Sequence, residues 1–225
     1  MNIKTITLFL FTAIFFTSCK KHAISQEELS TNLHNEWCSC LQKSNSNFEE
    51  ILTKDAIKCL SIVMTTYVND SINYQQIKHL IEQKKYDASL TDYEKERFFG
   101  KELGNYIINN AVDNCDVYRQ AVINMKKHYI ALAQQEVTLN NLKDLDELIN
   151  VLKEQLDALK NTKVTNVEAK NKISHFYTIY GLLLEYKNRP DQALEQYNMA
   201  LELNPENSSA YGFKRLLLLK ESKSS

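Results

Sequence analysis

The stretch NEWCSCLQ at residues 35–42 contains two cysteines that flank one serine. These are the residues whose type and spacing could do chemistry. Such a C-x-C pair is compatible with thiol–disulfide exchange, with part of a metal site, or with two structural disulfides. His34 lies four residues before Cys38, on the same helical face, and would be the next ligand of a metal site. Redox cysteines usually occur as C-x-x-C near a βαβ pattern, which is not visible here. The compartment in which the chain folds decides between these chemistries.

The first residues, MNIKTITLFLFTAIFFTSCKK, have the layout of a secretory signal. Lys4 precedes an apolar run from Ile6 to Phe16, and small residues follow. The run is too short to cross a bilayer, which needs about 20 apolar residues. This layout predicts export from the cytoplasm.

The segment FTSC, which ends at Cys19, resembles a lipobox, the site where bacterial lipoprotein signal peptides are cut. The resemblance implies that residues 1–18 are removed and that Cys19 carries the lipid, palmitate included. Several acyl chains on one residue give stable membrane anchoring. Residues 19–25 would form a short membrane-proximal linker. Lys20 and Lys21 do not resemble the acidic tract that sends some lipoproteins to the cell surface, which favours the periplasmic face of a Gram-negative outer membrane.

An exported chain folds where disulfides can form, and four cysteines remain besides Cys19. Residues two apart on a helix differ by about 200° in direction, so Cys38 and Cys40 should not bridge each other. Cys40 lies in the apolar stripe of its helix, as Cys59 does on the next one. We therefore expect Cys40–Cys59 and Cys38–Cys115 bridges, each stabilising by about 3–4 kcal/mol.

The composition predicts an all-α fold, because 225 residues include only 4 Gly and 2 Pro. Helix starts of the S/T-x-x-E kind occur at Ser25–Glu28, Ser46–Glu49, Thr91–Glu94 and Thr165–Glu168. Apolar residues then recur at three- and four-residue spacing, and further helices are expected near 73–86, 91–113 and 115–136. Residues 26–136 are predicted to form a helical domain cross-linked by disulfides.

A second helical region, residues 137–225, is predicted from a change in composition, since no cysteine occurs beyond this point. A helix over 139–162 is expected to pack beside its neighbours rather than form a coiled coil, because its leucine stripe lasts only about three heptads. The stripe consists of Leu142, Leu145, Leu148, Leu152, Leu156 and Leu159.

Residues 174–207, SHFYTIYGLLLEYKNRPDQALEQYNMALELNPEN, resemble a tetratricopeptide repeat, a 34-residue helix–turn–helix unit. The residues at family spacing are Tyr177, Gly181, Ala193, Tyr197, Ala200 and Pro205. Asn188 replaces the usual glycine of the turn, and asparagine is the next-best residue for a left-handed conformation. Residues 208–222 resemble the first helix of a further repeat, acting as a closing cap.

The resemblance implies that the first repeat helix lines a groove for a peptide or helix. The groove residues carried over are His175, Thr178, Leu182, Glu185 and Tyr186. A single repeat offers little concave surface, so a purely structural buttress remains the alternative.

No catalytic constellation or cofactor motif is found in the sequence. The formal net charge of −1 provides no basic field for a phosphate backbone, which argues against nucleic acid. Asp70-Ser71-Ile72 resembles a bacterial O-glycan acceptor, with Ser71 as the modified residue. We expect a lipid-anchored, non-catalytic adaptor or assembly factor that binds a protein through its repeat region. The alternatives are a thiol–disulfide protein using Cys38 and Cys40, and a purely structural lipoprotein.

Overall fold

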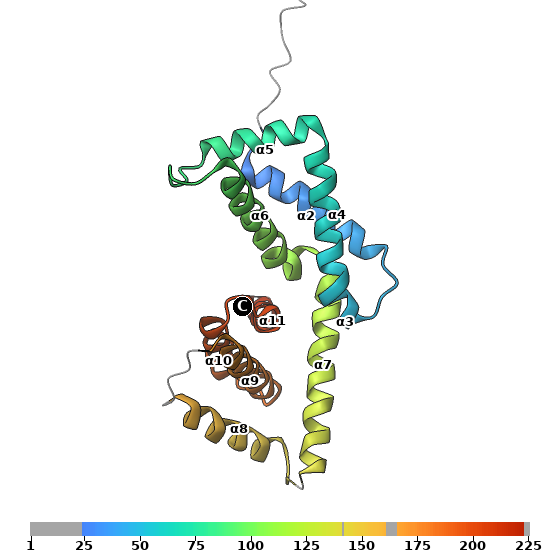
Figure 1. Cartoon of the computed structure of the whole chain (residues 1–225). Coiled ribbons are helices and arrows are strands. Elements are labelled where there is room, and N and C mark those ends of the chain that lie inside the picture. Colours follow the sequence, from blue (N-terminus) through green and yellow to red (C-terminus); the bar gives the residue numbers. More distant parts are fainter. Residues whose placement is uncertain (1–23, 141, 161–165, 223–225) are drawn as a thin grey trace, which may run out of the picture.

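The computed structural model describes residues 24–140, 142–160 and 166–222, and all regular secondary structure within these ranges is helical (Figure 1). The predicted all-α class is therefore confirmed. The predicted signal peptide, Cys19 and most of the 19–25 linker lie outside the described residues. Within the described ranges, no helix has the length and apolar character needed to cross a membrane.

The first half of the chain folds into helices around α2. In chain order these elements are α2 (Gln26–Gln42), α3 (Phe48–Glu50), the π-helical turn η1 (Ile51–Asp55), α4 (Ala56–Asn69), α5 (Ser71–Gln83) and α6 (Asp92–Asn114). One face of α2 is fully buried, and the Trp37 indole N–H donates a 2.9 Å hydrogen bond to the Ala56 carbonyl. Because that carbonyl lies in the first turn of α4, this bond fixes how α4 crosses α2.

Several helices begin directly after a residue whose side chain caps their first turn. The Thr91 hydroxyl accepts from the Glu94 amide while the Glu94 carboxylate accepts from the Thr91 amide, so the predicted capping box is complete. Ser25 caps α2 as predicted. The expectation at Ser46 is wrong, because Asn47 caps α3 instead by accepting from the Glu50 amide at 3.0 Å.

The long helix α7 (Asp116–Leu139) runs down one side of the molecule and contacts both halves of the chain (Figure 1). The second half follows as α8 (Leu145–Lys160), α9 (Val167–Tyr186), α10 (Pro190–Leu203) and α11 (Ser208–Ser222). The start of α9 is capped by Asn166 through the Glu168 amide, and the expected cap Thr165 lies outside the described residues.

One hydrophobic core runs through both halves, joining α2 and α6 to α9 and α11 through α7. Leu103, Leu183 and Phe213 belong to this same cluster and are at most 1 % exposed. A smaller cluster under α8 gathers Leu156, Tyr177 and Ala200. The expected packing of the leucine helix against the C-terminal helices is thus present. No break between helices marks the domain boundary predicted near residue 137, because α7 runs across this position as one helix. The boundary therefore stays a prediction.

Candidate functional site

The two cysteines of the C-x-C stretch bond to different partners. Cys38 is joined to Cys115 with a Cα–Cα distance of 5.6 Å, and Cys40 is joined to Cys59 at 5.7 Å. Both predicted pairings are confirmed. One bridge ties α2 to the junction of α6 and α7, and the other ties α2 to α4. Because Cys38 and Cys40 are not bonded to each other, they do not form a single dithiol unit.

His34, the metal ligand considered in the sequence, is a buried core residue with 4 % of its surface exposed. Its Nδ1 lies 3.3 Å from the Ile107 carbonyl oxygen, and its Nε2 has no hydrogen-bond partner among the described residues. The Cys38 sulfur beside it is occupied by Cys115, and no group of three or more potential ligands converges within the described chain. Burial lowers the pKa of His34, outweighing its backbone hydrogen bonds.

The buried His34 predicts that the fold is less stable in mild acid. Its pKa is lowered in the folded state, so below the ordinary value of 6.5 the unfolded chain binds more protons and the free energy of unfolding falls. The loss continues until the pH passes the lowered folded pKa. Urea unfolding at pH 7.5 and 5.0 should show a smaller difference in His34→Gln than in wild type. His79→Gln, at an exposed position of α5, is the control and should keep the wild-type difference.

The helix pair α9–α10 packs closely at the positions on which the sequence resemblance depends. A Cβ on Gly181 would lie 2.8 Å from the Tyr197 ring, so only glycine permits this approach. Asn188 adopts φ 59° in the turn, as expected, and Pro190 starts α10. Ala193, Tyr197 and Ala200 are fully buried, and Tyr177 is 4 % exposed.

The face of α9 that was expected to form a partner groove is covered by other parts of the chain. Glu185 accepts from the Lys126 ammonium of α7 at 2.6 Å, and the ring of His175 packs edge-on against Tyr129 of α7 at 5.9 Å. Thr178 and Leu182 are inside the molecule, at 0 and 2 % exposure.

Of the five expected groove residues, His175 and Tyr186 stay exposed, Tyr186 at 54 %. The groove position is therefore filled by α7 in this structure, and these five residues do not form one open surface. Sequence periodicity shows that a face of α7 is buried but not which helix it covers.

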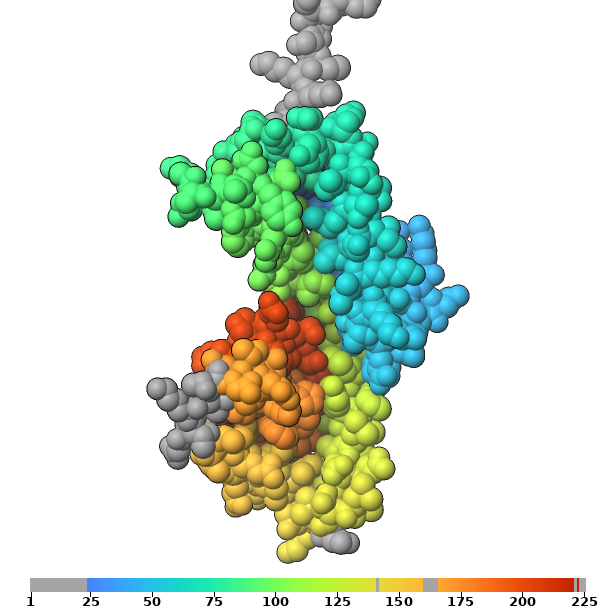
Figure 2. Space-filling view, viewed as in Figure 1, coloured from blue at the N-terminus to red at the C-terminus, as the bar shows by residue number. Residues whose placement is uncertain are grey.

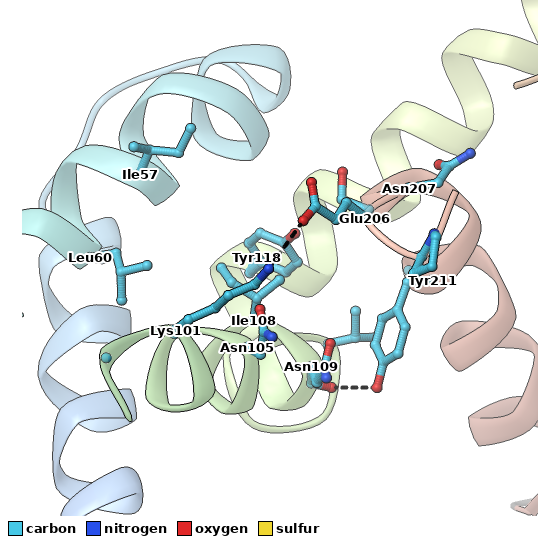
Figure 3. A pocket seen from close by; sticks show the side chains of 16 residues that line it. Ile57, Leu60, Lys101, Asn105, Ile108, Asn109, Tyr118, Glu206, Asn207 and Tyr211 are labelled. Atoms are coloured by element: carbon cyan, nitrogen blue, oxygen red, sulfur yellow. Dashed lines mark hydrogen bonds and ion pairs between the residues drawn. The ribbon is translucent and has the colours of Figure 1, made fainter. Parts of the chain in front are cut away.

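A different concave surface lies where the two halves meet, and we call it the α4–α6–α11 cleft (Figures 2 and 3). It has a volume of about 670 Å³, within the usual range of ligand pockets. Its lining consists of Ile57, Leu60, Gly100, Lys101, Gly104, Asn105, Ile108, Asn109, Val112, Tyr118, Pro205, Glu206, Asn207, Ser208, Tyr211 and Gly212. Pro205 is the one lining residue that the sequence singled out, and it belongs to the repeat-like unit.

The floor of the cleft is one face of α6, on which two kinds of residue run side by side. Gly100, Gly104 and Ile108 form a low apolar strip beside Leu60 of α4. Lys101, Asn105 and Asn109 form a polar strip towards α11. A Cβ on Gly100 would meet nothing within 4 Å, so the space above this glycine is open.

Tyr118, the third residue of α7, closes the back of the cleft behind the Lys101–Glu206 pair (Figure 3). Its side chain is 4 % exposed, and its hydroxyl makes no hydrogen bond to any described residue. Burial raises its pKa to about 12, so the hydroxyl keeps its proton at neutral pH. The ring is fixed by Trp37 at 5.5 Å. A hydroxyl that lines a cleft without a protein partner is a group to which a ligand can hydrogen-bond.

Contacts cross the cleft at both ends. At one end Lys101 and Glu206 pair at 3.7 Å, with side chains 66 and 84 % exposed. Such an exposed pair adds little stability and can open. At the other end the Tyr211 hydroxyl donates to the Asn109 carbonyl oxygen at 3.1 Å.

Beyond this end, Arg215 of α11 holds the carboxylate of Asp113 of α6 through two Nε contacts of 2.7 and 2.9 Å. The two halves are therefore joined firmly at one end of the cleft and loosely at the other.

Sequence reasoning missed this cleft, although a signal was present. All four glycines lie inside helices, and two of them, Gly100 and Gly104, fall on one helix, where each is destabilising by about 1 kcal/mol relative to alanine. Asn105 and Asn109 flank them with the same four-residue spacing. The remaining site prediction, Ser71, is the exposed first residue of α5 directly after its cap Asp70, and nothing in the structure bears on its modification.

Comparison with known proteins gives no significant match. No protein-family model, curated protein or solved structure matches this chain significantly.

Proposed function

We propose that this protein is a lipid-anchored, non-catalytic adaptor or assembly factor of a Gram-negative cell envelope, facing the periplasm from the outer membrane. Its anchor is the lipid on Cys19, and its C-terminal region is built on a tetratricopeptide-type helix pair at residues 174–207. The sequence layout around Cys19 and the residue spacing of the helix pair support these two elements. Its binding partner is a protein.

The observation that carries the binding proposal is the α4–α6–α11 cleft. One wall comes from the disulfide-bonded first half. The other comes from the end of the repeat-like unit, where Pro205 and Glu206 lie, and from the following helix α11, where Tyr211 lies. Two disulfides and the Arg215–Asp113 pair hold these walls in place before any ligand binds. A site that is already ordered loses less conformational entropy on binding. The repeat-like unit thus serves as a wall of the site, while its own inner face is filled by α7.

Site-specific photo-crosslinking tests the binding proposal in living cells of the native host. A photoreactive amino acid at Ile57, in the cleft, is compared with the same amino acid at Val167, outside the cleft lining, since both native side chains are 71 % exposed. We expect a protein adduct of defined mass from position 57 and none of that mass from position 167. Equal adduct patterns at the two positions, or none at position 57, would contradict a binding role for the cleft.

The anchoring proposal has its own test, which is the Cys19→Ser variant. We expect the wild-type chain in the membrane fraction and the variant in the soluble periplasmic fraction, each followed by immunoblotting. Membrane association that survives the substitution would show that Cys19 is not the anchor.

A further inference from the structure

We propose that the α4–α6–α11 cleft binds an extended polypeptide segment, whose backbone is held by the carboxamides of Asn105 and Asn109. This inference rests on the proposed function, because it names the form in which the protein partner enters the cleft.

The spacing of the two asparagines matches the repeat of an extended chain. They lie four residues apart on α6, which places their side chains about 6 Å from each other on one face. In an extended strand, residues two apart point the same way and are separated by about 6.7 Å. Each carboxamide carries a donor and an acceptor, so each can pair with one peptide group of the ligand. Both side chains line the cleft, and neither makes a hydrogen bond to a described residue.

The strip beside the asparagines suits the side chains of such a segment. Gly100 leaves the backbone of α6 open, and Ile57 of α4, which lines the same cleft, has 71 % of its surface exposed. Every second side chain of an extended ligand would therefore bury apolar surface between α4 and the glycines. This arrangement predicts a preference for apolar residues at alternate positions of the ligand.

Two further features suit an extended peptide, namely the length of the cleft floor and the Tyr118 hydroxyl at its back. The lining stretch of α6 from Gly100 to Val112 is about 18 Å long, which corresponds to about five extended residues. Tyr118 offers a protonated hydroxyl without a partner, and a backbone carbonyl of the ligand is the acceptor that it lacks. Peptides that bind with their main chain in this way gain specificity from alternate side-chain pockets.

Peptide selection on the full chain in detergent tests the proposal. Random 12-residue peptides displayed on phage are selected against wild type, and the strongest binder is synthesised with a fluorescent label. By anisotropy, Asn105→Leu and Asn109→Leu should each weaken binding about thirtyfold, because each removes two hydrogen bonds of the kind that contribute about 1 kcal/mol. Asn110→Leu is the matched control, since the Asn110 amide is bonded to the Tyr106 carbonyl and lies outside the cleft lining.

The Gly100→Ala variant separates binding from folding. The new methyl group meets nothing within 4 Å and improves helix propensity, so the thermal midpoint should rise by a few degrees. Peptide affinity should nevertheless fall several-fold, because the methyl group enters the open floor. Parallel loss of stability and affinity would contradict this assignment of the floor.

N-methylation of the selected peptide tests the backbone contacts directly. Methylation at two positions spaced by two residues should abolish binding, and methylation at the intervening position should be tolerated. Binding that is insensitive to N-methylation, or equal in wild type and the Asn105→Leu/Asn109→Leu variant, overturns the extended-peptide proposal. If the adduct at position 57 persists in that case, the proposed function stands and only the mode of binding fails. If the adduct at position 57 is absent as well, both proposals fail.

Discussion

Replacing Cys38 and Cys115 together by alanine should lower the free energy of unfolding by about 4.5 kcal/mol. Their bridge closes a separation of 77 residues, and the loop-entropy relation gives this value for a loop of that length. Small domains have a total stability of about 5–15 kcal/mol, so the variant should be close to unfolding at 37 °C. Urea titration followed by circular dichroism measures the difference.

The Cys40→Ala/Cys59→Ala variant is the matched control within the same helix. Its bridge spans 19 residues, for which the same relation gives about 3 kcal/mol. The order of the two losses is the informative result. A larger loss from the shorter loop would show that packing around Cys40 and Cys59, rather than chain entropy, dominates the contribution of these bridges.

The disulfide pairing could be predicted because helical phase is local information. Cys38 and Cys40 are two residues apart on one helix, and this spacing alone sends their side chains to different neighbours. The turn at Asn188 was predictable for the same reason, since its conformation depends on a few adjacent residues. The all-α class followed from the shortage of glycine and proline. These predictions used helical phase, adjacent residues and composition, none of which depends on the tertiary arrangement of the helices.

The position of α7 could not be predicted, because it depends on which apolar faces meet in three dimensions. The spacing of Tyr118, Ala121 and Val122 shows a buried face on α7, but the pattern is equally compatible with several partner helices. In the structure α7 covers α9, which removes the groove that the repeat resemblance implies. The cleft that remains is formed by residues about 100 positions apart, such as Asn109 and Tyr211, with a separation of 102. No local pattern joins such residues.

The second large loss of stability is expected in the variant Glu185→Leu, which removes the contact that fixes α7 on α9. Lys126 pairs with Glu185 at 2.6 Å, and the two side chains are only 15 and 17 % exposed. The Tyr197 hydroxyl donates to the same carboxylate at 3.0 Å. Removing the carboxylate leaves a buried ammonium and a buried hydroxyl without their acceptor. Breaking a buried pair in this way lowers the free energy of unfolding by about 3–5 kcal/mol.

The control for an exposed pair is Glu168→Leu. Glu168 binds Lys172 at 2.9 Å with both side chains at least 70 % exposed, and pairs of this kind contribute at most about 1 kcal/mol. Chemical denaturation of the two variants under identical conditions should therefore separate them clearly. Equal small losses would mean that the Lys126–Glu185 pair does not hold α7 in place.

Two further measurements identify the unpaired Lys126 as the cause of the loss in Glu185→Leu. The double variant Lys126→Met/Glu185→Leu should recover most of the stability, because it removes the buried charge and keeps the volume. Burial lowers the pKa of Lys126 even in wild type, and without Glu185 that pKa falls further. The unfolded chain then binds more protons than the folded one, so the deficit of Glu185→Leu should shrink as the pH rises towards 10.5, the ordinary lysine value. A deficit that is constant with pH and unchanged in the double variant would instead point to lost packing around Tyr197, and α7 would then be held by apolar contacts alone.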